Sequence, residues 1–202
     1  HDCGKVTSPE HIVDKATKLE VIYNRIHELR LRFEVLWRDA EIAHLQRVAA
    51  GADAQASAAE RDARHAQLQD DFAFVAQCNV GGEFMADAAI ERLHTIARQT
   101  WQRHFDNRLG LSSEELKRVQ AAEPQAPTLP VAEALLADRP EHLVPWTNDR
   151  PPVEKGHPDN HYGFDMVLPP HKQNMGELHN LGIRRGTLTD EDRFKINDHI
   201  VQ

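Results

Sequence analysis

The sequence predicts an all-α fold, in which long antiparallel helices form a hairpin or small bundle joined to a Pro-rich irregular segment. Aromatic residues make up only 6% of the chain and alanine is common, a composition that favours helix over sheet. Apolar residues recur at the spacing of a helix face through the first half of the chain. Prolines gather instead in residues 124–177, where long helices cannot form.

The longest predicted helix covers about residues 17–49. Alternating steps of three and four separate its apolar residues, which form a heptad stripe: Leu19, Ile22, Ile26, Leu29, Phe33, Leu36 and Ala40. At 1.5 Å per residue such a helix would be roughly 45–50 Å long, too long for a small core to bury alone. It therefore needs a partner. A helix at 83–105 of the same chain and a second copy of the chain both stay open as that partner.

Shorter helices follow from periodicity and from capping signals. They are predicted at about 53–79, 83–105 and 131–138, after Ser112, and from Asp190 onward. Gly81 and Gly82 end the first of these. Ser112 with Glu115 makes a capping box, and Thr189 caps the last helix.

Charge and composition exclude several classes of partner. The chain has 24 basic and 32 acidic residues, a net charge of −8, and no basic patch, so we expect no nucleic-acid polymer as partner. No run approaches the roughly 20 apolar residues that span a bilayer, and no signal peptide is visible. Cys3 and Cys78 have no disulfide framework around them. We therefore predict a cytoplasmic protein without membrane contact, with both thiols reduced.

Two motifs at opposite ends of the chain carry the chemistry. The first is His1-Asp2-Cys3-Gly4-Lys5, followed by Pro9-Glu10. An adjacent histidine and aspartate offer an imidazole and a carboxylate to one metal cluster. The second is Gly186-Thr187-Leu188-Thr189, followed by a helix pattern that carries His199. A histidine on a distant helix is a common way to complete such a cluster.

Together these motifs resemble the HD-GYP family of metal-dependent phosphohydrolases, which are helical HD-superfamily domains. Many members hydrolyse cyclic di-GMP. The resemblance lies in residues 1–18 and 183–202, and residues 19–182 would be a helical insertion that contains the Pro-rich loop 124–177. The whole is similar to bacterial members in which the opening of the domain is split by such an insertion.

The resemblance implies a role for each matching residue. His1 and Asp2 are expected to bind metal, with His199 as the ligand from the returning helix. Two or three divalent ions, most simply Fe or Mn, fit this mixture of imidazole and carboxylate, and the ligand types do not choose between these metals.

The resemblance also implies contacts with the substrate, a cyclic dinucleotide or another phosphoester. Lys5 is the expected catalytic lysine, which would contact a phosphate. Arg184 and Arg185 precede the returning loop, and we hypothesise that they also contact a substrate phosphate.

Several family motifs have no match in these 202 residues: the downstream His-His-Glu, the later aspartate ligand and the Gly-Tyr-Pro segment. We therefore expect the chain alone to bind metal poorly and to be inactive. An alternative reading treats the insertion as the functional unit, a helical interaction or dimerisation module that regulates a split or inactive HD-GYP domain.

Five histidines in the long loop region invite a second metal site: His142, His157, His161, His171 and His179. His157 and His161 are four residues apart, but Pro158 interrupts the helix that would bring them onto one face. No cysteine or carboxylate pair supports them, so we interpret all five as solvated loop residues.

Overall fold

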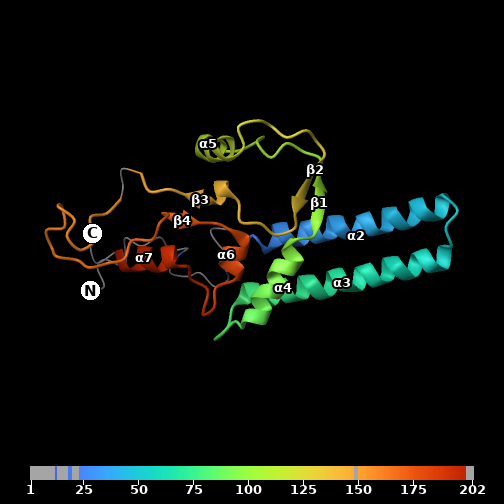
Figure 1. Cartoon of the computed structure of the whole chain (residues 1–202), viewed down its shortest axis with the longest axis horizontal. Helices are drawn as coiled ribbons and strands as arrows, with labels where there is room; N and C mark the ends of the chain where they lie inside the picture. Colours follow the sequence, from blue (N-terminus) through green and yellow to red (C-terminus); the bar gives the residue numbers. More distant parts are fainter. Residues whose placement is uncertain (1–11, 13–17, 20–22, 148–149, 199–202) are drawn as a thin grey trace.

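The structure is a computed structural model, and it describes residues 12, 18–19, 23–147 and 150–198. Helices dominate it, which confirms the all-α class (Figure 1). The helices are α2 (Ile26–Ala49), α3 (Ala54–Val80), α4 (Asp87–Ala97), α5 (Ser113–Ala122), α6 (Glu177–Leu181) and α7 (Asp190–Asp198), with the short 3-10 helix η2 (Pro140–His142). The strands are β1 (Thr100–Arg103), β2 (Val131–Ala134), β3 (Leu143–Val144) and β4 (Gln173–Asn174).

Helices α2 and α3 form a long antiparallel hairpin that extends away from the other elements (Figure 1). The turn at its tip contains Gly51, whose φ of +90° suits glycine. Asp53 then caps α3, because its Oδ1 accepts a hydrogen bond of 2.6 Å from the backbone N–H of Ala56. The helix predicted at 53–79 is therefore confirmed.

The predicted start of α2 near residue 17 is wrong. The backbone N–H of Lys18 donates to the carbonyl of Asn79 at 2.8 Å, and that of Leu19 donates to Asn79 Oδ1 at 2.8 Å. These contacts hold both residues against the end of α3, so α2 begins only at Ile26. Leu19 is nevertheless buried, as its place in the heptad stripe predicts.

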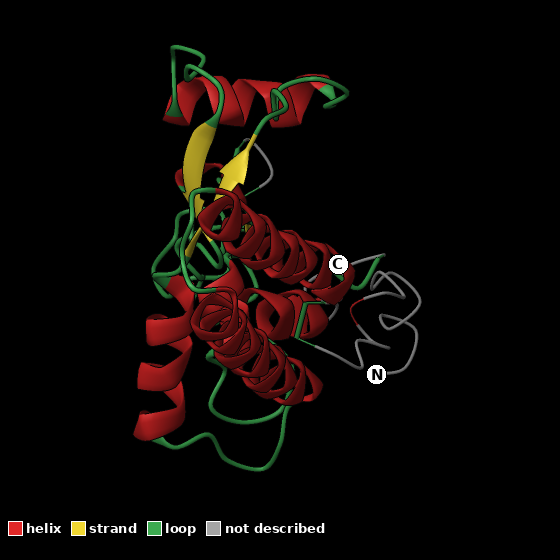
Figure 2. Ribbon diagram, turned by 90° about the vertical axis from the view of Figure 1, so that its right-hand side faces the viewer, coloured by secondary structure: helices red, strands yellow, loops and turns green. Residues whose placement is uncertain are grey.

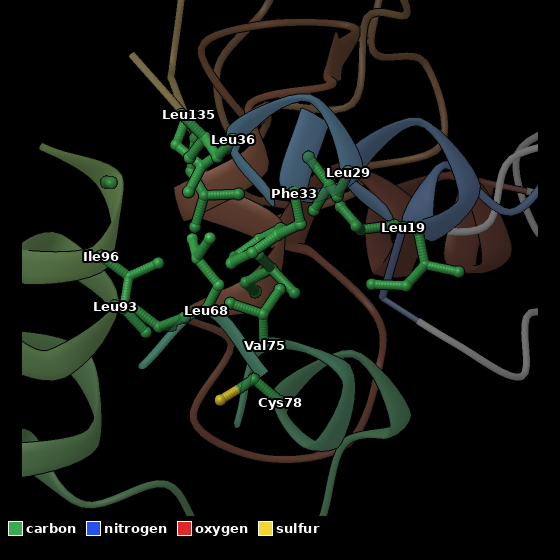
Figure 3. Close-up of a cluster of buried hydrophobic side chains, with 14 residues drawn as sticks. Leu19, Leu29, Phe33, Leu36, Leu68, Val75, Cys78, Leu93, Ile96 and Leu135 are labelled. Atoms are coloured by element: carbon green, nitrogen blue, oxygen red, sulfur yellow. The ribbon is translucent and has the colours of Figure 1, made fainter. Parts of the chain in front are cut away.

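The partner of α2 is α3 rather than a helix at 83–105. Leu29 and Phe33 of α2 face Leu68 and Val75 of α3 in one buried cluster (Figure 3). Helix α4 adds Leu93, among other side chains, at the edge of the same cluster. Intramolecular packing thus buries the stripe, and dimerisation through the long helix stays a prediction.

Two predicted helices are partly or wholly strands. Residues Thr100–Arg103 pair antiparallel with Val131–Ala134, so the helix predicted at 83–105 ends at Ala97 and the one at 131–138 does not form. Arg103 in β1 forms an ion pair with Glu133 in β2. Pairing between segments this far apart supplies hydrogen bonds that no local pattern records.

Helix α5 lies at the far end of the β1–β2 ribbon, away from the hairpin (Figures 1 and 2). Its predicted capping box is confirmed: the Ser112 hydroxyl accepts from the N–H of Glu115, whose carboxylate accepts from the N–H of Ser112. The hydrogen bonds to Ser112 are the leading reason that the pKa of Glu115 lies below its ordinary value.

Helices α6 and α7 begin with side-chain caps. Asp138 accepts hydrogen bonds from the N–H groups of Leu178 and His179 at the start of α6. A Cβ on Gly176 would lie 2.5 Å from Asp138 Oδ1, so only glycine leaves room for this cap. Thr189 and Asp192 exchange reciprocal hydrogen bonds at the start of α7, which confirms the helix predicted from Asp190.

Candidate functional site

The residues predicted to bind metal, His1, Asp2 and His199, lie outside the described residues, as does Lys5. Within the part of the chain that the structure describes, no group of three or more His, Cys, Asp or Glu side chains could hold a metal ion. The imidazole and carboxylate types of the predicted ligands do suit a divalent transition metal. What the structure describes are the residues next to these motifs in the chain, namely Lys18 and the loop before α7.

Lys18, the last residue of the predicted first piece, is buried against the start of the predicted second piece. Its Nζ donates to the carbonyl oxygen of Leu181 at 2.6 Å and to that of Ile183 at 3.0 Å. Burial lowers the pKa of Lys18, and the charge interaction with Cys78 opposes this effect only in part. The two carbonyl groups compensate the ammonium for much of the water that it loses. A contact across more than 160 positions thus joins the two regions.

The returning loop is held by the linker between α3 and α4. The N–H of Met85 donates to the carbonyl of Arg184 at 2.9 Å, and the N–H of Gly186 donates to that of Gly82 at 3.1 Å. Gly81 has a φ of +80°, and a Cβ there would lie 3.0 Å from the carbonyl oxygen of Gly186. Glycine at position 81 therefore permits the close approach of the two segments.

The two arginines of the returning loop do not converge on one described partner. Arg184 Nη2 is 2.6 Å from Asp87 Oδ1, in an exposed ion pair with the start of α4. Arg185 is exposed, and its carbonyl oxygen accepts a hydrogen bond of 3.3 Å from Arg193 Nη2. A phosphate bound by Arg184 would compete with Asp87.

A cleft of about 630 Å³ lies between α7 and the extended segment that precedes β4. One wall is largely apolar, and the other carries titratable side chains from α6 and α7. The residues lining it are Met166, Val167, Leu168, Pro169, Pro170, His171, Asn174, His179, Asp190, Glu191, Arg193, Phe194 and Asn197. The volume lies within the range of small-molecule sites.

Trp146 fixes the two walls of the cleft relative to each other. Its Nε1 donates to the carbonyl oxygen of Pro169 at 2.8 Å. Its ring lies edge-on to Phe194 of α7, with centroids 5.8 Å apart. One tryptophan thus contacts both the Pro-rich segment and the helix.

An ion pair between His179 and Glu191 lies in the cleft. The His179 Nε2 atom is 3.5 Å from Glu191 Oε2, and the side chains are 38% and 5% exposed. This Oε2 accepts no hydrogen bond of good geometry from the described residues, so the ion pair is its main compensation. Contact with Glu191 raises the pKa of His179, which outweighs the opposite effect of burial. Burial alone would raise the pKa of Glu191, but the contacts with His179 and its other partners hold it below its ordinary value.

The sequence pattern does not reveal this pair. The prediction that His179 is a solvated loop residue is wrong, because its backbone N–H donates to Asp138 and its ring faces Glu191. His142 is also partnered, because its Nδ1 accepts from the N–H of Arg139. The sequence gives only a weak indication that Glu191 pairs with a histidine. Glu191 lies in the first turn of a helix, where an acidic residue usually interacts with the helix dipole.

The comparisons with known proteins agree with one part of the sequence analysis. Residues 130–202 match the sequence model of the HD domain family, which supports an HD-superfamily domain and, in general, a metal-dependent phosphohydrolase. The matched region contains α6, α7 and the cleft. Neither a curated protein nor a solved structure matches the chain. Among the described helices, none combines the length and apolar character needed to cross a membrane.

Proposed function

We propose that this chain contributes two pieces of an HD-GYP-type phosphohydrolase that cleaves the phosphodiester of cyclic di-GMP. The pieces are residues 1–18 and 183–202, and residues 19–182 form the helical insertion between them. The motifs at the two ends support this assignment. The HD domain match at 130–202 supports its coarser part, an HD-superfamily domain.

The observation that carries the proposal is the position of Lys18. A domain split by an insertion needs the chain to leave and return at neighbouring points. Lys18 Nζ binds the carbonyl of Ile183, the first residue of the returning piece. The linker at Gly82 and Met85 also pairs with the returning loop, at Gly186 and Arg184. These contacts support an insertion whose two ends lie close together.

The proposed chemistry is hydrolysis by an activated water. His1, Asp2 and His199 would hold the metal ions, together with ligands from further segments. Divalent ions bound there would activate water and neutralise charge on the phosphoryl oxygens. Lys5 would place a fixed cation against the same phosphate. Arg184 would join it only after release from Asp87.

The test is metal content and cyclic di-GMP hydrolysis, measured on these 202 residues and on a longer version that supplies the remaining family motifs. We expect metal and turnover only in the longer protein. There, replacing Asp2 or His199 with alanine should lower turnover by about a hundredfold or more, because loss of even a hydrogen-bond partner of a metal ligand costs about 10–100-fold.

His157→Ala is the matched control, because His157 lies in the Pro-rich loop and, among the described residues, its hydrogen bonds stay within its own turn. Its turnover should equal that of the parent. Turnover by the 202 residues alone would contradict the expectation that the site is incomplete. Unchanged turnover in Asp2→Ala and His199→Ala would refute the assignment of the ligands.

The hairpin surface favours a second function, that of an interaction module. Leu31, Ile42 and Leu45 are exposed on α2, away from the stripe that α3 covers. Sedimentation velocity of the chain with a chelator present distinguishes the two proposals. Association that rises with chain concentration, and that Leu45→Glu abolishes, would support the module, whereas a monomer at all concentrations would exclude self-association.

A further inference from the structure

We infer that the cleft between α7 and residues 166–171 binds the phosphate of a nucleotide, with His179 as its cationic hydrogen-bond donor. This inference deepens the proposed function and rests on it for the identity of the ligand as a nucleotide. The HD domain match covers the region without assigning any role to the cleft.

The geometry of His179 makes one ring nitrogen available to a ligand. Its Nε2 faces Glu191, and within the described part of the chain no contact occupies Nδ1. The side chain is 38% exposed, whereas the carboxylate behind it is almost wholly buried. A buried carboxylate that faces one nitrogen orients the ring and favours its protonated form. The imidazolium can then donate from Nδ1 into the cleft.

The charges around His179 are of both signs. Glu191, Asp190 and Asp138 are the carboxylates that act on it, and the first two also line the cleft. Arg193 and His171 line the cleft with it and supply further donors. Because an imidazolium and a guanidinium both form short, charge-assisted hydrogen bonds with phosphate oxygens, a phosphate group suits this wall.

The opposite wall suits the remainder of a nucleotide. Met166, Leu168 and Pro169 offer apolar surface, against which a sugar or a base can pack. A free phosphate ion would leave this wall unused. The ligand class is therefore a nucleoside phosphate rather than inorganic phosphate.

The cleft also lies close to the proposed metal site along the chain. Asn197 lines the cleft and precedes His199 by two residues. A cyclic dinucleotide carries two phosphates, and the cleft is suited to hold the one that is not being cleaved.

The test is isothermal titration calorimetry of the 202-residue chain with GMP, guanosine and inorganic phosphate, in EDTA at about pH 6.5, near the ordinary pKa of histidine. We expect GMP to bind at least tenfold more tightly than either of the other two. His179→Gln should weaken GMP binding at least tenfold. His161→Gln, on the exposed loop outside the cleft, should leave it unchanged. Failure of GMP to bind, equal binding of guanosine, or equal affinities in the two variants would overturn the inference.

Glu191→Gln separates a positioning role from a structural one. Wild-type affinity for GMP should fall as the pH rises through the pKa of His179. Without the Glu191 charge that pKa drops, so the fall should occur at lower pH, while binding at the acidic end is retained. Comparison of variant and wild type at each pH cancels the titration of GMP itself. If Glu191→Gln weakens GMP binding by the same factor at every pH, the positioning role of Glu191 is overturned.

These measurements need no metal and no turnover. A longer protein that hydrolyses cyclic di-GMP while the cleft fails to bind GMP would refute this inference alone. Binding of GMP by the wild type and its loss in His179→Gln, without hydrolysis in the longer protein, would refute the catalytic proposal alone.

Discussion

Replacing Glu177 with alanine is expected to lower the free energy of unfolding by about 3–5 kcal/mol, the range found when one partner of a buried ion pair is removed. The Glu177 carboxylate is 2% exposed. Arg32 reaches both of its oxygens, at 2.9 and 3.0 Å, and Arg25 lies at 3.4 Å. The N–H of Ala137 donates to it at 2.9 Å. The substitution would leave two half-buried guanidinium groups without their counter-charge.

Glu34→Ala is the matched control, because Glu34 pairs with Arg38 on the exposed face of the same hairpin. Exposed pairs of this kind contribute about 0–1 kcal/mol, so the control should change stability little. Urea denaturation followed by circular dichroism measures both variants. If both variants lose the same free energy of unfolding, the buried ion pair of Glu177 contributes no more to stability than the exposed pair of Glu34.

The same carboxylate predicts an acid dependence of stability. Burial would raise the pKa of Glu177, but Arg32, the N–H of Ala137 and Arg25 together hold it below its ordinary value. A carboxyl group whose pKa is depressed on folding stabilises the fold above its unfolded pKa. That stability is lost as the pH falls through the folded pKa. Wild-type protein should therefore lose more stability than Glu177→Gln below about pH 4.5, and parallel pH profiles would contradict this.

Replacing Leu29 with alanine is expected to lower the free energy of unfolding by about 3–5 kcal/mol. Leu29 is 0% exposed and lies in the cluster where α2 meets α3 (Figure 3). The destabilisation has two parts: the transfer free energy of the deleted carbon atoms and the cost of the cavity that they leave. Differential scanning calorimetry and urea denaturation would measure the change.

Leu31→Ala is the control on the same helix, two positions away and 66% exposed. Since both substitutions change helix propensity equally, the difference between them isolates burial. We expect Leu31→Ala to stay within about 0.5 kcal/mol of wild type. Similar losses at both positions would mean that α3 is not the partner that covers the stripe.

The elements predicted correctly are those that carry their own local signals. Helices α3, α5 and α7 are preceded by the caps Asp53, Ser112 and Thr189, whose side chains accept hydrogen bonds from the first turn. A cap lies within three residues of its partner, so its chemistry is visible in the sequence. The burial of Leu29 and Phe33 likewise follows from their spacing.

The errors lie where distant segments satisfy the backbone. Thr100–Arg103 extends because Val131–Ala134 pairs with it, and α2 starts late because Asn79 accepts from Lys18 and Leu19. The packing of α2 on α3 rather than on a helix at 83–105 is likewise a tertiary contact. Such pairings depend on the whole chain and are not encoded by periodicity.

The candidate sites also fall into two groups, those visible in the sequence and those formed only by folding. The chemistry of His1, Asp2 and His199 follows from residue types and motif spacing alone, since an imidazole and a carboxylate are metal ligands wherever they meet. The ion pair of His179 and Glu191, and the junction of Lys18 with Ile183, emerged only from the folded chain. Burial and charge act over a few ångströms in space, and residues 12 or 165 positions apart reach that distance only when the elements between them have packed.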